Sequence, residues 1–133
     1  MKEHLTVFVS GHLDVTPDEF LTYYVPKLTI YLKQGCHFIV GDANGADFLA
    51  QEYLFTQLTA LKQLRRLTVV HMFDAPRNLC HDEIATVGGF TSDGERDDYG
   101  TAHSELDLLY LKPGRLNSGT AKNLIRRLST LKK

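Results

Sequence analysis

The 133-residue sequence predicts an α/β fold, in which an open and mostly parallel sheet is covered by helices on both faces. Four short segments rich in β-branched, aromatic and other apolar residues alternate along the chain with segments that have the apolar spacing of amphipathic helices. The turns from strand to helix are short, which favours right-handed βαβ crossovers. A chain of this length fits one domain, residues 1–133, because single cores usually hold roughly 100 to 150 residues.

The strands and the first helix are predicted from local signals. The four strands are expected at residues 5–11, 36–41, 67–73 and 106–112. A helix is expected to begin after Thr16, an N-cap followed by Pro17 at the first helical position and by Glu19 three residues after the cap. Pro26 is expected to kink or interrupt this helix, because it has no N–H and crowds the preceding turn. Gly35 closes the helix.

The remaining segments are less regular. A second helix is expected over residues 46–61, and a moderately helical pattern covers residues 92–105. The last helix has one apolar face, formed by Ala121, Leu124, Ile125, Leu128 and Leu131. The polar, Gly-rich segment 74–91 contains no clear element, and we interpret it as a lid or an ordered binding loop.

The composition is that of a folded globular protein. Hydrophobic residues make up 43% and charged residues 23%, so neither disorder nor a disulfide scaffold is indicated. The formal net charge of -1 argues against a broad basic surface for nucleic acid. Acidic residues dominate between Asp74 and Asp107, and basic residues dominate the C-terminus. This pattern fits either two solvated faces of opposite sign or a small anion site near the basic end.

Two features concern the cellular setting. Cys36 and Cys80 have no CxxC spacing, and the N-terminal sequence is charged and then strand-like, unlike a signal peptide. We therefore expect free thiols in a reducing cytoplasm. No apolar run approaches the roughly 20 residues of a membrane helix, so no membrane span is expected.

Unusual residues gather where the predicted strands end, which is where open α/β sheets bind their ligands. Glycine in such turns lets backbone N–H groups approach an anion held at a helix N-terminus. The turns GDANGA and SGT therefore fit either phosphate cradles or tight structural turns, and their presence on one sheet edge favours cradles. The strand ends carry Ser10, Gly11 and His12, then residues 41–47, then His71 and Arg77, and finally residues 113–120.

The glycine turns match neither of the common phosphate motifs. Gly41 and Gly45 lack the third glycine of GxGxxG, and no Gly-Lys-Ser/Thr follows them. Asp47 falls in the first turn of the second helix, where a carboxylate either caps the helix or takes part in chemistry. His12 and His71 have no second ligand at a metal-like spacing, so no metal site is expected.

Arg96 has two interpretations. Its guanidinium can bind two phosphate oxygens at once, which makes it a candidate ligand residue. It can equally be an exposed arginine that pairs with Asp93 or Asp97.

With both turns located, the pattern resembles the SLOG superfamily, which groups the Lonely-guy phosphoribohydrolases, the DprA proteins and many small YpsA-like and DUF2493-like domains. The resemblance covers nearly the whole chain and is carried by VFVSG, VGDANGADFLAQEY, GERDDYG and LKPGRLNSGTAKNL. It implies a Rossmann-like three-layer domain that binds a nucleotide, a nucleotide sugar or a cyclic ADP-ribose-like signal, with no further cofactor. Related proteins are often dimers or larger, which implies a homo-oligomer.

Carried over by position, the resemblance implies a ligand site formed by two Gly-rich turns. Ser10 and Gly11 would lie beside the ligand, and Arg96 would reach toward its ribose or phosphate. The two cradles would consist of Gly41, Asn44, Gly45, Ala46 and Asp47, and of Pro113, Gly114, Ser118, Gly119 and Thr120.

One departure from the SLOG enzymes bears on mechanism. The Lonely-guy enzymes share the motif PGGxGTxxE, and its glutamate assists cleavage of the bond between base and ribose. In this chain Arg115 to Ser118 separate the Pro-Gly and Gly-Thr pairs, and Asn123 stands at the glutamate position. An amide cannot ionise, so it cannot supply the carboxylate that oxocarbenium chemistry needs. Binding of a nucleotide-derived ligand is therefore the leading functional prediction.

Two alternatives stay open. The first is an N-glycoside hydrolase or transferase acting on nucleosides or nucleoside monophosphates, with Asp47 or Glu95 as the catalytic carboxylate. The second is a DprA-like nucleic-acid-handling module that uses the basic residues of the last helix, Lys122, Arg126 and Arg127. The net charge and the lack of an aromatic stacking platform disfavour this second alternative.

Overall fold

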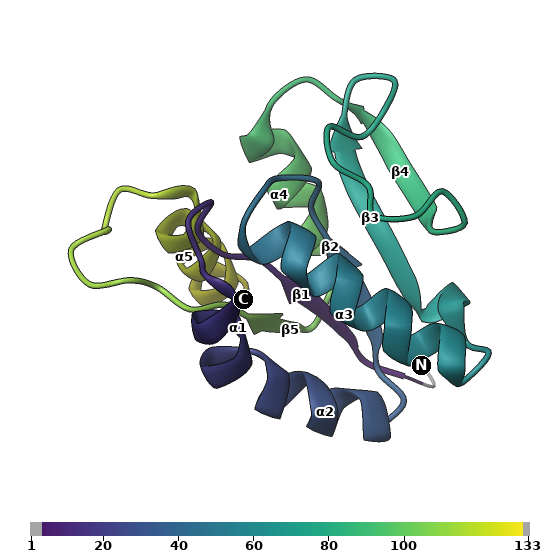
Figure 1. The fold of residues 1–133 in the computed structure, drawn as a ribbon. Coiled ribbons are helices and arrows are strands. Elements are labelled where there is room, and N and C mark those ends of the chain that lie inside the picture. Colours follow the sequence, from purple (N-terminus) through teal and green to yellow (C-terminus); the bar gives the residue numbers. More distant parts are fainter. Residues whose placement is uncertain (1–3, 132–133) are drawn as a thin grey trace.

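The computed structural model describes residues 4–131, which form one five-stranded, all-parallel sheet with helices on both faces (Figure 1). The predicted Rossmann-like three-layer α/β fold is confirmed. The strands lie in the order β4-β3-β2-β1-β5. They are β1 (Thr6–Val9), β2 (His37–Val40), β3 (Leu67–Met72), β4 (Ala85–Phe90) and β5 (Leu106–Leu108).

The helices divide between the two faces because successive strand residues point in opposite directions. One face carries α1 (Pro17–Tyr23), α2 (Val25–Lys33) and α3 (Ala46–Ala60), and the other carries α4 (Asp93–Ala102) and α5 (Gly119–Leu131). Val7 and Val9 of β1 belong to the main core, together with Leu28 of α2 and Leu54 of α3. Phe8, between the two valines, belongs to a smaller core on the α4 side.

The first helical region is interrupted, as predicted. Thr16 and Glu19 form a reciprocal capping box, in which the Glu19 N–H donates to Thr16 Oγ1 at 3.2 Å and the Thr16 N–H donates to Glu19 Oε1 at 2.9 Å. Helix α1 ends at Tyr23 and α2 begins at Val25, with Pro26 in its first turn. Proline is tolerated there because the first N–H groups of a helix have no partner within the helix.

Strand β5 is shorter than the predicted strand at residues 106–112. The N–H of Tyr110 donates to Tyr24 Oη at 3.0 Å, and the N–H of Lys112 donates to His12 Nε2 at 2.9 Å. Because side chains take these backbone donors, the chain leaves the sheet after Leu108 and continues as a loop over residues 109–118.

The segment 74–91, interpreted from sequence as a lid or loop, contains the edge strand β4. Residues 74–84 connect β3 to β4 without a helix and pack against α3. Gln51 of α3 donates to the carbonyl of Asn78 at 3.0 Å and accepts from the N–H of Cys80 at 3.0 Å, and Ile84 is buried in the main core. Strand β4 is largely exposed and contains two glycines, so it lacks the apolar pattern of an interior strand.

Helix α5 is oriented differently from its predicted apolar face. Ala121 is buried, but Leu124, Ile125, Leu128 and Leu131 are exposed, and the buried positions include Thr120 and Asn123. The helix is oriented by polar contacts, because Arg127 donates to Asp107 at 2.9 Å and to the Ser104 carbonyl at 2.9 Å.

None of the helices within residues 4–131 has the length and apolar character needed to cross a lipid bilayer. Cys36 and Cys80 carry free thiols.

A glycine in α4 sets how closely this helix approaches the sheet. A Cβ atom at Gly100 would lie 2.7 Å from the ring of buried Phe8. We expect Gly100→Ala to lower the free energy of unfolding by roughly 1–3 kcal/mol, because overpacking outweighs the gain in helix propensity. Gly94→Ala in the same helix has space for the methyl group and should raise that free energy by about 0.5–1 kcal/mol. Urea unfolding measures the free energy of unfolding of both variants. An equal increase in the two variants would contradict the close approach of α4 to Phe8.

Candidate functional site

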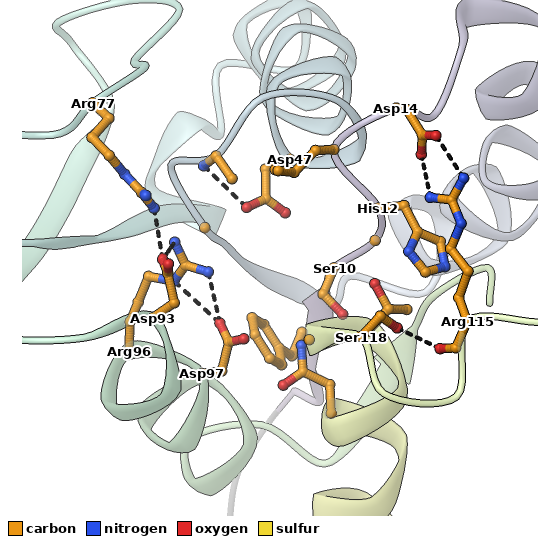
Figure 2. A pocket seen from close by; sticks show the side chains of 18 residues that line it. Ser10, His12, Asp14, Asp47, Arg77, Asp93, Arg96, Asp97, Arg115 and Ser118 are labelled. Carbon is orange, nitrogen blue, oxygen red and sulfur yellow. Dashed lines mark hydrogen bonds and ion pairs between the residues drawn. The ribbon is translucent and has the colours of Figure 1, made fainter. Parts of the chain in front are cut away.

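A cavity of about 610 Å³ opens beyond the carboxyl ends of the strands (Figure 2). The chain runs outward from β1 to β2, β3 and β4, and then places β5 on the other side of β1, so β1 marks a topological switch point. The loop after β1, the first turns of α3 and α5, and the side of α4 form its walls. This is the sheet edge at which the sequence places its unusual residues.

The cavity brings together most of the predicted ligand residues. Lining it are Ser10, Gly11, Gly41, Asp47, Arg96, Ser118, Gly119 and Thr120. The predicted residues that do not line it are Asn44, Gly45, Ala46, Pro113 and Gly114. Glu95, the second candidate carboxylate, also lies outside the lining, and it accepts from the N–H and Oγ1 of Thr91 at 3.3 Å.

Several charged residues line the cavity although they were not among the ligand residues that the resemblance implied. They are Asp14, Arg77, Asp93, Asp97 and Arg115. Arg77 follows the third strand, and Asp93 and Asp97 lie close to Arg96 in sequence. The positions of these three residues were therefore a partial signal that they lie near the cavity. Nothing local indicated that Asp14 and Arg115, 101 positions apart, form a bidentate ion pair at 2.6 and 2.7 Å.

The glycines of the GDANGAD turn make room for groups of the chain itself. Gly45 has a φ of +71°, and a Cβ atom there would overlap the carbonyl of Leu13. A Cβ atom at Gly41 would overlap Oδ2 of Asp47 and lie 3.3 Å from Cζ of Arg96. Gly45 therefore allows close packing of two loops, and Gly41 admits a carboxyl group and a guanidinium to the cavity wall.

Asp42, fully buried, joins three parts of the fold. Its Oδ1 accepts from Nη2 of Arg77 and from Nη1 of Arg96, each at 2.9 Å. Its Oδ2 accepts from the backbone N–H of Arg77 at 2.8 Å. Burial opposes its ionisation, but the hydrogen bonds from Arg77 and Arg96 outweigh burial and lower the pKa of Asp42. The carboxylate thus ties the end of β2 to the 74–84 connection and to α4.

Arg96 is 6% exposed, so the expected exposure is wrong, but the expected pairing with Asp93 and Asp97 is confirmed. Its Nε and Nη2 donate to Asp97 at 3.1 and 3.0 Å, and its Nη1 also contacts Asp93 at 3.0 Å. Burial disfavours the charged form, but the adjacent carboxylates outweigh it and raise the pKa of Arg96. Its guanidinium is therefore engaged within the chain, and the same holds for Arg77, which pairs with Asp42 and Asp93.

Asp47 differs from the other cavity carboxylates in having no arginine in direct contact. Its Oδ2 accepts one hydrogen bond, from the N–H of Ala43 at 3.2 Å. Burial raises the pKa of Asp47 to about 7, and the more distant charge of Arg96 opposes this rise. The carboxyl group points into the cavity (Figure 2). It can therefore gain or lose a proton near neutral pH.

Asn123, at the position of the family glutamate, belongs to a polar network between α4 and α5. Its Oδ1 accepts from Nη1 of Arg126 at 2.7 Å, and its side chain hydrogen bonds to Asp97. Burial raises the pKa of Asp97, against the opposing effect of Arg96. A carboxylate is thus present beside the Asn123 amide, supplied by α4.

The first turn of α5 forms an open part of the wall. Ser118 caps the helix, because its Oγ accepts from the Ala121 N–H at 3.1 Å and donates to the Arg115 carbonyl at 2.8 Å. A Cβ atom at Gly119 would meet nothing within 4 Å. On the same cavity, Ser10 is 6% exposed, and its Oγ is buried without a hydrogen-bond partner among residues 4–131.

His12 fixes the loop that precedes α5. Burial and then the charge of Arg115 lower the pKa of His12, so its ring is neutral near pH 7. The neutral Nε2 can accept the Lys112 N–H, and the other ring nitrogen carries the proton. His71 takes no part in the cavity, and within residues 4–131 no group of three or more His, Cys, Asp or Glu side chains is placed to hold a metal ion.

The raised pKa of Asp47 makes stability depend on pH. Between pH values of about 3.8 and 7 the unfolded chain releases this proton and the folded chain keeps it, so folding stability falls as pH rises. Asp47→Asn removes this penalty while keeping an acceptor for Ala43. We expect a gain in unfolding free energy of up to roughly 4 kcal/mol at pH 8, which disappears toward pH 4.

Denaturant unfolding at both pH values measures this difference. Asp98→Asn, at an exposed carboxylate of α4, is the matched control and should change stability by less than about 1 kcal/mol. A pH-independent effect of Asp47→Asn would show that Asp47 ionises normally in the folded protein.

Comparison of the chain with protein-family models gives no match, and searches among curated proteins and among solved structures give none either.

Proposed function

We propose that this protein binds a nucleotide or nucleotide-derived ligand in the cavity at the end of β1. The observation that carries the proposal is the Ser10 hydroxyl, which is buried at the cavity wall without a partner among the described residues. An unsatisfied buried hydroxyl costs about 1–3 kcal/mol, and a polar ligand group would remove this cost. The cavity volume of about 610 Å³ also suits a ligand of nucleotide size.

The first turn of α5 is the best position for a phosphate. N–H groups at a helix N-terminus lack partners within the helix, and the helix dipole favours an anion there. Gly119 leaves this turn uncovered by a side chain. Because carboxylates engage Arg77, Arg96 and Arg115, we expect amides and hydroxyls to hold the phosphate in place of an arginine clamp.

This arrangement modifies the expectation of two glycine cradles. The α5 turn keeps Ser118, Gly119 and Thr120 of its expected cradle at the cavity, whereas the GDANGAD turn contributes the Asp47 carboxyl group and packs its glycines against the chain. Membership of the SLOG superfamily and assembly into a homo-oligomer stay predictions of the sequence resemblance.

A glycine substitution tests the position of the phosphate. Gly119→Ala places a methyl group in the open turn, and we expect it to weaken binding of a nucleoside 5′-monophosphate about tenfold without altering the melting temperature. Gly94→Ala, in the first turn of α4, is the matched control and should leave affinity unchanged. Isothermal titration with nucleotides, nucleotide sugars and cyclic ADP-ribose measures the effect. If none of these ligands binds or shifts the melting temperature, the proposed function is wrong.

N-glycoside cleavage is a second candidate function, favoured by the ionisation of Asp47. A carboxyl group with a pKa of about 7 at a cavity wall can donate a proton to a departing base near neutral pH. Glu95 is not favoured for this role, because it lies outside the cavity lining. The DprA-like alternative is not favoured either, since Arg126 and Arg127 pair with Asp98 and Asp107.

Release of free base distinguishes an enzyme from a binding protein. If the protein cleaves nucleoside monophosphates, Asp47→Asn should lower the rate at least about 100-fold, and Glu95→Gln should leave it unchanged. Chromatography of the products measures the rate. Full activity of Asp47→Asn would exclude Asp47 as the proton donor.

A further inference from the structure

The carboxyl group of Asp47 has an unused hydrogen-bonding atom inside the cavity. Oδ2 accepts from Ala43, but no residue within 4–131 donates a hydrogen bond to Oδ1. The residue is only 4% exposed, and its carboxyl group points into the cavity (Figure 2). Oδ1 is not one of the fully buried side-chain atoms without a partner, so it is accessible from the cavity, where a bound ligand can supply a donor in place of solvent.

The groups around Asp47 do not supply this donor. Arg96 approaches from α4, but its contacts go to Asp42, Asp93 and Asp97. Asp97 from α4 and Asp42 from the end of β2 are themselves carboxylates. Tyr24, between α1 and α2, donates its hydroxyl to the carbonyl of Ser10 at 2.8 Å.

The surroundings also decide which kind of ligand group fits. A phosphate or carbonyl facing the ionised Asp47 and Asp97 would bring further acceptor oxygens against existing ones. A group with two adjacent donors has the complementary pattern, because a carboxylate can accept two parallel hydrogen bonds and such bonds are charge-assisted. Oδ2 can take one of them in addition to the Ala43 N–H, since each carboxylate oxygen has two lone pairs.

We propose that Asp47 determines ligand specificity by binding, as a carboxylate, two adjacent hydrogen-bond donors of the ligand. In a nucleotide this pattern occurs in the cis-diol of ribose and in the N1–H and N2–H₂ edge of guanine. The inference rests on the proposed function and adds to it the part of the ligand that the protein recognises. It also gives Gly41 a role, because a side chain there would displace the carboxyl group.

A dependence of affinity on pH follows from this arrangement. Near neutral pH the empty site is partly protonated, and its position in the first turn of α3 favours the carboxylate once donors arrive. A ligand that binds only the carboxylate binds more tightly as pH rises. We expect about tenfold higher affinity at pH 8 than at pH 6, with little further gain above pH 8.

Titration calorimetry with guanosine 5′-monophosphate at pH 6 and pH 8 tests the inference on the wild type, on Asp47→Asn and on Asp98→Asn. Phosphate also titrates near pH 6, so the pH response of Asp47→Asn is the reference. In the wild type and in Asp98→Asn, the ratio of affinity at pH 8 to affinity at pH 6 should be about tenfold larger than in Asp47→Asn. A melting curve of Asp47→Asn checks that this variant is folded. If Asp47 binds the ribose diol, the 2′-deoxy analogue should show the same change of affinity with pH in the wild type and in Asp47→Asn. If Asp47 binds the guanine edge, inosine 5′-monophosphate should show that result instead.

The possible failures can be distinguished. The role of Asp47 is overturned, and the proposed function still stands, in either of two cases. In the first, affinity changes with pH equally in the wild type and in Asp47→Asn. In the second, both analogues keep the larger change of affinity with pH that the wild type shows with guanosine 5′-monophosphate. Absence of binding by all three nucleotides at both pH values, together with a negative wider ligand panel, would overturn the proposed function itself.

Discussion

The buried carboxylate of Asp42 holds the walls of the cavity in place. It accepts hydrogen bonds from Arg77, in the connection between β3 and β4, and from Arg96 in α4. Removing one partner of a buried ion pair commonly costs about 3–5 kcal/mol, because the remaining charge stays buried. Asp42 therefore determines where α4 lies relative to the end of β2, and with it the positions of the other acidic side chains.

This network explains why the cavity is polar without offering unpaired arginines. Arg77, Arg96 and Arg115 line it, yet each is paired with aspartates of the chain. The cavity groups that no arginine or carboxylate of the described chain engages directly are the Ser10 hydroxyl, the first turn of α5 and the Asp47 carboxyl group. Retaining an ionisable group in a buried position lowers stability, and such a cost is common where a site serves a function.

The sequence predicted elements best where the signal is local. The capping box of Thr16, the interruption at Pro26 and the start of α3 after Gly45 all follow from residues within one turn of each other. Strand β4 was missed because an exposed edge strand with two glycines has no apolar pattern. The buried side of α5 was wrong because Arg127 anchors the helix through Ser104 and Asp107, a contact that no helical periodicity encodes.

In the candidate site, too, local features could be predicted from the sequence, whereas contacts between distant residues could not. By itself the sequence determined the α/β class, the sheet edge at which the cavity opens and eight of the residues that line it, because strand ends and glycine turns are local features. Only the tertiary structure decided that Arg96 pairs with Asp42, 54 positions away, and that Asp47 has no such partner. It also assigned Gly41 and Gly45 to close packing of the chain itself. Pairing and burial depend on which elements pack together, and they set the charge of each group, so these properties emerge only when the chain is folded.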